Sequence, residues 1–328
     1  MHPNFRLKGA VSSTFAGQKI AAVYTELEGL TVNAFSSSEE WDWRQLEKGK
    51  WTLFCALAHG RSMELLPAIL GRFAETDIRV VDLSGDFRLD SSQEYSDYYG
   101  KKHISPGWLS KFVYGLPEFE KEKITCSRFT ANPGCFATAA QLAMRPLASL
   151  KQPPQFIAID GKTGSSGAGT FPSPTTHHPL RANNFRAYKV DGHQHYPEIK
   201  RGWEVSGGSQ EMAISFVPQM TPLVRGIFTT VHAFFPEEMD RCVLREHFDQ
   251  VYTESPLVKM MDESPAVGDV SGTSRCDISV HVQGRCAVIC AALDNLLGGA
   301  AGRAIQNANL MSGWKETAGL LSPPSRPV

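Results

Sequence analysis

Trp51-Thr52-Leu53-Phe54-Cys55-Ala56-Leu57 is a nearly continuous apolar run, typical of a strand that is buried on both faces. His59-Gly60-Arg61-Ser62 follows and begins a helical pattern. A second short apolar run, residues 78–83, comes after this helix and predicts another buried strand. A strand, a helix and a strand in this order predict a parallel α/β sheet. The positions that set the helical spacing are Met63, Leu66, Ile69, Leu70 and Phe73.

Strands of a different kind follow residue 135. The segments 156–159, 212–217 and 227–234 predict strands, the last two long and antiparallel, and 276–282 with 287–293 predicts a pair of strands. A helix with an alanine-rich apolar face is expected from about Asn295 to Leu310. We therefore expect an α/β domain and an α+β domain with an antiparallel sheet. The expected division is 1–131 with 295–328 for the first domain and 132–294 for the second.

Composition excludes several classes of protein. The 33 basic and 34 acidic side chains nearly cancel, so no basic footprint for nucleic acid exists. No apolar run approaches the roughly 18 residues that a membrane helix needs, and the N-terminus lacks the features of a secretion signal. The seven cysteines are scattered, without a Cys-x-x-Cys pair, which argues against disulfides and zinc. We expect a reduced cytoplasmic protein that has no metal.

One cysteine lies on a sharp turn. Asn132-Pro133-Gly134-Cys135-Phe136-Ala137-Thr138 combines a Pro-Gly turn with the start of a helix that Pro146 is placed to end. Unpaired N–H groups and the positive end of the helix dipole favour thiolate over thiol, and thiolate is the nucleophile. The alternative is a small buried apolar residue, as most free cysteines are. The turn favours a presented, reactive Cys135.

This stretch resembles the active-site signature of the N-acetyl-gamma-glutamyl-phosphate reductases, the NADPH-dependent enzymes of arginine biosynthesis. The resemblance covers nearly the whole chain, and several blocks in the family's order are more specific than any single motif. The other blocks are Val80–Leu89, Tyr114-Gly115-Leu116-Pro117-Glu118, Gly164-Ser165-Ser166-Gly167-Ala168-Gly169, Arg186-Ala187-Tyr188-Lys189, Gly192–Glu198, Arg225-Gly226-Ile227 and Asp294-Asn295-Leu296.

The resemblance implies a Rossmann-type NADP-binding domain that lacks its first βα unit. Such a fold holds the pyrophosphate on a Gly-rich turn after its first strand, and this sequence has no G-x-G-x-x-G. The Gly-rich block 164–169 lies too late to serve. In the family, a strand, a Gly-rich turn and a helix precede the segment that here begins at His2. We expect that Met1 is a start placed too late; a natural truncation is the alternative.

The resemblance also implies the chemistry. Cys135 attacks the acyl carbon of an acyl phosphate, expels phosphate and forms a thioester, which hydride from NADPH reduces through a thiohemiacetal to the aldehyde. His195 or His193 moves the proton, with His195 favoured, and Glu198 could orient it. Proline in His195-Tyr196-Pro197 predicts a helix start there. A metal half-site is the alternative for the histidine pair, but no ligand spacing accompanies it.

Substrate contacts are expected from four cations and one hydroxyl. The forked guanidinium of Arg225 suits a carboxylate or a phosphate. Each of the other cations is equally compatible with a structural salt bridge. The further candidates are Arg88, Arg186, Lys189 and Ser166.

The cofactor residues are expected at the two ends of the dinucleotide. Ser12 and Ser13 end a predicted strand at 7–11, and without an acid there they favour NADP over NAD, an ST-turn being the alternative. Gly167 and Gly169 permit close approach of the backbone to the nicotinamide or the acyl group. Asn295 would cap the last helix or hold the carboxamide of the nicotinamide. The chain departs from the family at Gly298, where or beside which a lysine is usual.

Two rival functions remain open at this point. One is the sister reductase that acts on an aminoadipyl or glutamyl phosphate carried by a small acidic protein. The other is a non-catalytic remnant, suggested by the absent Gly-rich turn. For the partners, the resemblance implies a small-molecule substrate and a homo-dimer or homo-tetramer.

Overall fold

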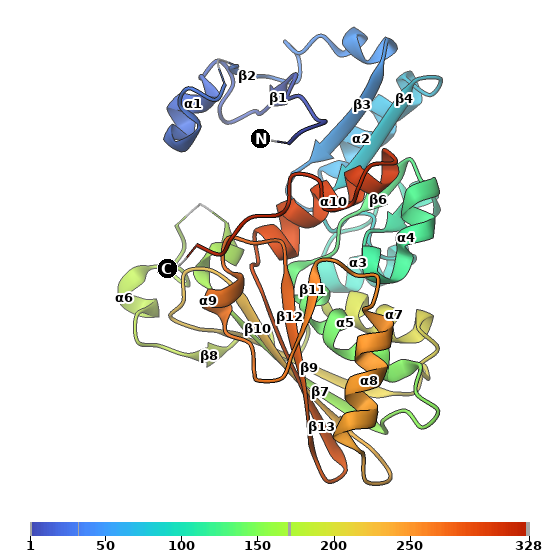
Figure 1. Cartoon of the computed structure of the whole chain (residues 1–328). Helices are drawn as coiled ribbons and strands as arrows, with labels where there is room; N and C mark the ends of the chain where they lie inside the picture. The colour runs from blue at the N-terminus through green and yellow to red at the C-terminus, as the bar shows by residue number, and fades with distance from the viewer. Residues whose placement is uncertain (1, 32, 170–171, 326–328) are drawn as a thin grey trace.

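The computed structural model of the chain describes residues 2–31, 33–169 and 172–325. Within these residues the strands form a two-stranded, a four-stranded and a seven-stranded sheet (Figure 1). The four-stranded sheet is parallel, as the sequence predicts, in the order β3-β4-β6-β5. Its strands are β3 (Lys50–Cys55), β4 (Asp77–Asp82), β5 (Val113–Tyr114) and β6 (Phe129–Ala131).

Helices cover this parallel sheet. The predicted helix is α2 (Ser62–Arg72), whose first turn is capped by the Asp86 carboxylate, which accepts the N–H groups of Gly60 at 2.7 Å and Met63 at 3.0 Å. The last helix, α10 (Gly302–Met311), packs on β4 although it is far away in sequence. The other helices here are α3 (Ser92–Tyr99), the 3-10 helix η3 (Pro106–Lys111) and α4 (Pro117–Cys126), which also contacts α10.

Strand β3 is less buried than predicted. It pairs with β4 and, among the described residues, with no other strand, so its second edge is open. Phe54 is 42 % exposed, and no residue of β3 is fully buried. The prediction of burial on both faces is therefore wrong here, because too little of the described chain packs on the faces of this strand.

The N-terminal segment forms a separate two-stranded parallel sheet, β1 (Ala10–Val11) with β2 (Phe35–Ser36). Figure 1 shows this blue segment standing apart from β3. Within the described part of the segment, Ile20 of α1 (Ile20–Val23) is a buried apolar residue, while most others are exposed. The absence of a first βα unit stays a prediction. Two short 3-10 helices, η1 (Thr25–Leu27) and η2 (Trp43–Glu47), complete the segment.

The large sheet has the order β11-β12-β13-β10-β7-β9-β8. It is mixed rather than antiparallel throughout, because β7 pairs with β9, and β11 with β12, in parallel. The predicted antiparallel pair 276–282 with 287–293 is confirmed as β12 and β13. The strands are β7 (Phe156–Thr163), β8 (Arg186–Ala187), β9 (Ala213–Met220), β10 (Ile227–Phe234), β11 (Val258–Met261), β12 (Cys276–Gln283) and β13 (Cys286–Leu293).

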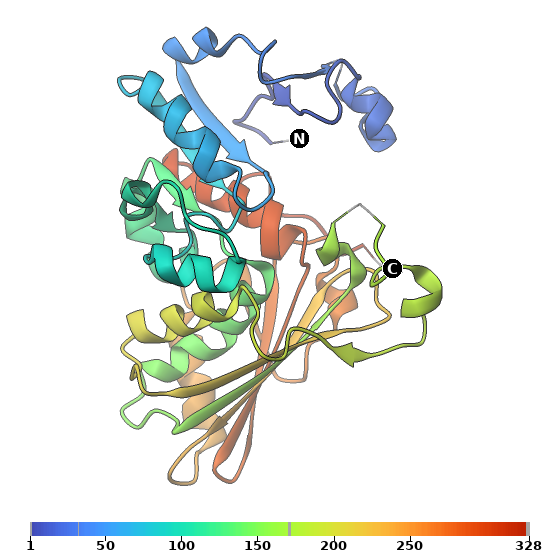
Figure 2. The same cartoon turned by 180° about the vertical axis from the view of Figure 1, so that it is seen from behind.

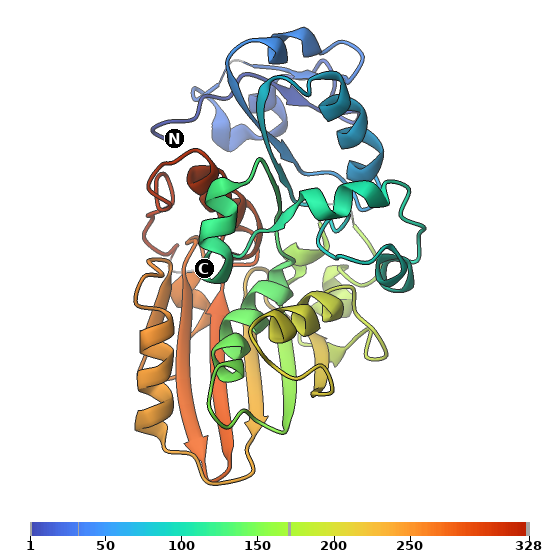
Figure 3. The same ribbon diagram turned by 90° about the vertical axis from the view of Figure 1, so that its right-hand side faces the viewer.

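Three helices lie on one face of the large sheet, as Figure 3 shows: α5 (Cys135–Ala148), α7 (Tyr196–Val205) and α8 (Arg241–Val251). After its first residue, α5 is buried along its whole length. It continues two residues past Pro146, which was expected to end it. Pro146 cannot donate to the carbonyl of Leu142, and the hydroxyl of Tyr252 donates to that carbonyl instead.

The last helix and several short elements complete the fold. The helix predicted over 295–310 begins as a π-helix, η5 (Leu297–Ala301), and continues as α10. Figure 2 shows α6 (His178–Arg181) and β8 beside the upper end of the large sheet. The remaining elements are the 3-10 helix η4 (Ser165–Ala168) and α9 (Val267–Val270). A domain boundary at 131/132 and 294/295 stays a prediction.

Candidate active site

Cys135 is the first residue of α5 and follows β6 through a three-residue turn. The turn is held at both ends. The N–H of Asn132 donates to the carbonyl of Asp82 at 2.7 Å, and the N–H of Gly134 donates to the Glu198 carboxylate at 2.9 Å. The side-chain amide of Asn132 donates to the carbonyl of Ala300 at 3.2 Å, which ties the turn to η5. The thiol is therefore presented from a fixed backbone.

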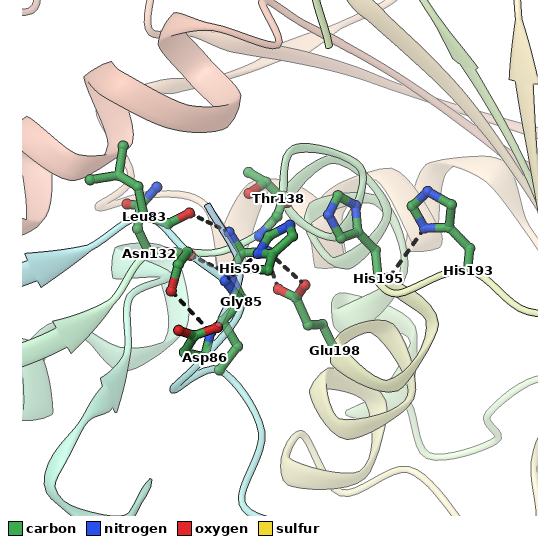
Figure 4. Close-up of polar contacts among 12 residues, drawn as sticks. His59, Leu83, Gly85, Asp86, Asn132, Thr138, His193, His195 and Glu198 are labelled. Atoms are coloured by element: carbon green, nitrogen blue, oxygen red, sulfur yellow. Dashed lines mark hydrogen bonds and ion pairs between the residues drawn. The ribbon is translucent and has the colours of Figure 1, made fainter. Parts of the chain in front are cut away.

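Glu198 organises a buried polar cluster beside this turn (Figure 4). Its carboxylate forms an ion pair with Arg88 at 3.1 Å and accepts the hydroxyl of Tyr114 at 2.8 Å. Both of its oxygens are thus engaged, and neither bonds to His195. The expectation that Glu198 orients His195 directly is therefore wrong: the carboxylate positions the turn of Cys135 instead.

Arg88 is part of the same cluster. It is 5 % exposed, and besides its ion pair it donates to the carbonyls of Asn132 and Leu83, both at 2.8 Å. Because Nε, Nη1 and Nη2 all donate to these partners, the guanidinium has few N–H groups left for a ligand. The substrate contact that the sequence suggested for Arg88 does not fit this arrangement, whereas a structural salt bridge does.

His195 lies directly over the turn. A Cβ on Gly134 would overlap the imidazole Nε2 of His195, so glycine is what allows the ring to approach the backbone of the turn. Nδ1 of His195 is buried without a partner among the described residues. In His193, Nδ1 instead accepts the N–H of His195 at 3.1 Å, and the two rings lie 4.8 Å apart (Figure 4). His195 is thus the ring that lies against the Cys135 turn, and His193 contacts His195.

Burial dominates the ionisation of these groups. It raises the pKa of the Cys135 thiol to about 11, against the N–H of Phe136 and the charge of Arg88, which lower it. It lowers the pKa of His193 to about 2 and that of His195 well below its usual range. The resting pair is therefore a thiol and a neutral imidazole. The expected preformed thiolate is not favoured, because desolvation outweighs the helix terminus.

A second polar cluster joins the Gly-rich block to the start of η5. The side-chain oxygen of Asn295 accepts the N–H of Gly226 at 2.7 Å, and its Nδ2 donates to Ser166 Oγ at 3.0 Å. Gly167 lies against it, since an added Cβ there would be 3.7 Å from Nδ2. The structure brings Ser166, Gly167 and Asn295 together. Arg225, one residue before Gly226, is 2.6 Å from Asp294 in an ion pair and remains partly exposed.

The other candidates lie farther out. Arg186 is exposed on β8, with its Nε 3.0 Å from the sulfur of Met220. The Lys189 ammonium donates to Gln194, also on the surface. Gly169 has a φ of 86°, which only glycine adopts easily. None of these three contacts the Cys135 turn in the interactions of the described residues.

Ser12 and Ser13 lie at the end of β1. Ser12 Oγ accepts the N–H of Phe15 at 3.2 Å, which is the ST-turn that the sequence allowed as the alternative. The hydroxyl-bearing side chains of Ser13 and Thr14 are exposed, and Lys19 follows them. Exposed hydroxyls and an ammonium are donors that fit the 2′-phosphate of NADP. The donor set at this strand end therefore fits the adenosine end of that cofactor.

Residues beyond the sequence candidates complete the surroundings. His59, which follows β3 in the loop before α2, accepts the N–H of Gly85 on Nδ1 at 2.8 Å (Figure 4). An added Cβ on Gly299 would lie 2.6 Å from the Cβ of Cys135, so the π-helix packs against Cys135. For His59 and Gly299, the available sequence signal was their place after apolar residues. Arg181 also belongs to these surroundings, but no sequence motif marks it.

Two broader features are negative. Within the described residues, no cluster of three or more His, Cys, Asp or Glu side chains could hold a metal ion. No helix in the described part of the chain is long and apolar enough to cross a membrane.

Comparison with known proteins identifies the class. Residues 1–127 match the family model of the semialdehyde dehydrogenase NAD binding domain, and residues 135–295 match the semialdehyde dehydrogenase dimerisation domain. Aspartate semialdehyde dehydrogenase II from Vibrio cholerae shares the fold, with a TM-score of 0.66 at 16 % identity over 93 % of this chain and 90 % of that one. The chain thus has the two-domain architecture of the semialdehyde dehydrogenases.

Sequence relatives narrow the class. The chain is 37 % identical to the N-acetyl-gamma-glutamyl-phosphate reductase of Magnetococcus marinus, over 99 % of this chain and 93 % of the relative. It is 40 % identical to the enzyme of that name from Methanococcus maripaludis (strain C5), over 84 % of this chain and 79 % of the relative. The chain belongs to the N-acetyl-gamma-glutamyl-phosphate reductase family.

Proposed function

We propose that the protein reduces N-acetyl-glutamyl 5-phosphate to the 5-semialdehyde with NADPH, in arginine biosynthesis. The observation that carries the proposal is the pairing of Cys135, at the start of α5, with the His195 ring over Gly134. This is a nucleophile beside a base, the arrangement that acyl transfer requires. The relatives that bear this enzyme's name over nearly the full chain support the choice of substrate.

The reaction begins with a proton transfer. Because the thiol and the imidazole are both neutral at rest, His195 accepts the proton of Cys135 as the sulfur attacks the acyl carbon. Phosphate leaves and a thioester of Cys135 remains. The N–H groups at the start of α5 favour negative charge developing beside them.

Reduction completes the cycle. NADPH, when bound, supplies hydride to the acyl carbon. His195 then donates the proton that it took from Cys135 to the oxyanion of the thiohemiacetal. Collapse of this intermediate releases the aldehyde and the Cys135 thiol. Glu198 keeps the turn in place through its bond to the Gly134 N–H. Ser166 and Asn295 are hydrogen-bonded to each other, and we assign this pair to contacts with the nicotinamide and acyl groups.

The protein works as a homo-oligomer in the cytoplasm. The helices on the large sheet lie on one face, and residues such as Phe156 and Phe234 on neighbouring strands are 38 % and 42 % exposed. A half-exposed sheet face of this kind suits a second copy of the chain. All seven cysteines are free, which suits a reducing compartment.

The assay follows NADPH oxidation with N-acetyl-glutamyl 5-phosphate as the substrate. A carrier-linked aminoadipyl or glutamyl phosphate, offered in parallel, tests the sister activity. Turnover of only the carrier-linked substrate would replace the proposed substrate. Absence of turnover with both, together with no binding of NADPH, would identify the non-catalytic alternative. Light scattering on the same preparation gives the oligomeric state.

A further inference from the structure

Arg181 is a buried cation that forms no ion pair with a carboxylate in the described part of the chain. It is 7 % exposed, its Nη2 donates to the carbonyl of Thr163 at 3.0 Å, and its Nε has no partner among the described residues. Burial lowers the pKa of Arg181, and in the described part of the chain no Asp or Glu opposes this. An unpaired buried charge is costly, so its retention requires an explanation.

Other buried arginines of this molecule are treated differently. Each of three has a glutamate within ion-pair distance, as is usual for a guanidinium taken out of water. The pairs are Arg88–Glu198 at 3.1 Å, Arg145–Glu120 at 3.3 Å and Arg303–Glu118 at 2.5 Å. Arg181 therefore lacks the counter-charge that the fold supplies elsewhere.

The location of Arg181 connects it to the active site. Thr163 ends β7, and two residues earlier Gly161 packs on α5, where an added Cβ would lie 2.6 Å from the ring of Phe136. Tyr188 links the two regions. Its ring lies 5.9 Å from that of His193, and its pKa is raised by burial and then by Cys135, and lowered by Arg181. Tyr188 is therefore close to both the Cys135 thiol and the Arg181 guanidinium, which is bonded to the end of β7.

We propose that Arg181 binds the α-carboxylate of the glutamyl substrate. The inference rests on the proposed function and names the group that recognises the end of the substrate that does not react. The acyl carbon must lie at Cys135, and the α-carboxylate is four carbon–carbon bonds away, about 5 Å when extended. A guanidinium at the end of β7, with Tyr188 near both it and the thiol, suits that distant anion better than the phosphate, which leaves at the thiol itself. The planar fork of arginine matches a carboxylate.

The reverse reaction separates the two anions, because inorganic phosphate and N-acetylglutamate 5-semialdehyde are added independently. In Arg181→Met we expect the KM for the semialdehyde to rise roughly 10–100-fold, as for a lost charged hydrogen bond. The KM for inorganic phosphate should stay within about twofold. The wild type should prefer this semialdehyde over 4-acetamidobutanal, which lacks the α-carboxylate, and the variant should lose that preference.

The matched control is Arg241→Met. Arg241 also donates to main-chain carbonyls, those of Val280 and Asp262, and lies on α8. The control has the same change in charge and should leave both KM values unchanged. The melting temperature of Arg181→Met should not fall, because the substitution removes a desolvated charge without stranding a carboxylate.

Binding without turnover distinguishes this inference from the function on which it rests. N-acetylglutamine keeps the α-carboxylate but has no leaving phosphate, and its titration should raise the melting temperature of the wild type and not of Arg181→Met. A rise that is equal in both proteins, or no rise in the wild type, would overturn the role of Arg181. A higher KM for phosphate alone would assign it to the phosphate instead. Binding of N-acetylglutamine without turnover of the acyl phosphate would sink only the proposed reaction.

Discussion

Opposing influences act on the thiol of Cys135. The N–H of Phe136 and the positive charge of Arg88 lower its pKa, but burial raises it to about 11. The sequence reveals the first kind of influence, because a turn and a helix start are local patterns. It does not reveal the second, since desolvation depends on η5, α7 and β7 folding around the thiol. Sequence analysis therefore placed Cys135 correctly at a turn before a helix and misjudged its resting charge, while its role as the nucleophile stays a prediction.

The reactivity of Cys135 should follow this protonation state. At pH 7 and without substrate we expect iodoacetamide to modify the exposed Cys242 before Cys135. Between pH 8 and pH 10 the rate at Cys135 should rise about tenfold per unit as the thiolate fraction grows. Peptide mapping over time measures both rates. Preferential labelling of Cys135 at pH 7 would show that the thiol is already ionised. Cys135→Ser should abolish reductase activity and keep the fold.

The two histidines should differ in catalysis. His195 lies over Gly134, whereas Nδ1 of His193 is already bonded to the His195 N–H. We expect His195→Asn to slow a single turnover about 10²-fold or more, the low end for a general acid–base group. His193→Asn should cost much less. The opposite ranking would make His193 the proton carrier.

Sequence motifs predicted which residues of the candidate site lie together, whereas the roles of these residues stay predictions. It proposed Cys135, Ser166, Gly167 and Asn295, and the structure brings the last three into one cluster. It assigned Arg88 to substrate because a sequence does not show which cations meet a buried carboxylate. Arg181 escaped notice for the same reason: its significance lies in a missing partner, which only three-dimensional packing reveals.

Among the elements, the π-helix η5 packs directly against Cys135. An added Cβ on Gly299 would lie 2.6 Å from Cys135, closer than real Cβ atoms come, whereas on Gly298 the nearest atom is 3.4 Å away. Gly299→Ala should therefore lower kcat and reduce the free energy of unfolding by about 1–3 kcal/mol, as overpacking does. Gly298→Ala, the matched control, should do much less. Equal effects on kcat and on denaturant unfolding would refute this account of η5.

Other elements show why local sequence patterns predict that a helix or strand exists better than they predict its burial or its pairing partner. The helix of residues 62–72 and the β12–β13 pair were predicted, because their periodicity is complete in themselves. The burial of β3 and the parallel pairing of β7 with β9 depend on which strand lies alongside. The extension of α5 past Pro146 depends on Tyr252, which is distant in sequence.

At the scale of the whole molecule, the buried histidines couple folding to pH. Burial lowers the pKa of His193 to about 2 and that of His195 well below 6.5, so both are neutral when folded. Their contribution to stability is present above the unfolded pKa near 6.5 and is lost as pH falls toward the folded values. Around pH 5, His193→Gln should reduce the slope of unfolding free energy against pH by up to about 1.4 kcal/mol per unit. The exposed His178→Gln should leave the slope unchanged, and equal slopes in all three proteins would contradict the role of burial.

The unequal packing of the molecule predicts unequal dynamics. The described residues of the N-terminal segment between Leu7 and Ser36 form a two-stranded sheet of their own and bury little besides Ile20, whereas α5 lies in the largest apolar cluster. Few buried contacts mean a low free energy of local opening. In hydrogen exchange followed by mass spectrometry, we expect the amides of this segment to exchange far faster than those of α5 or β13. If exchange in this segment is as slow as in α5 without cofactor, the segment is held by interactions that its exposed surface does not provide.

NADPH should slow exchange around Ser12 and Ser13, because the hydroxyl-rich end of β1 fits the cofactor phosphate. If NADPH slows exchange elsewhere but not at Ser12 and Ser13, the assignment of the adenosine end to β1 is wrong.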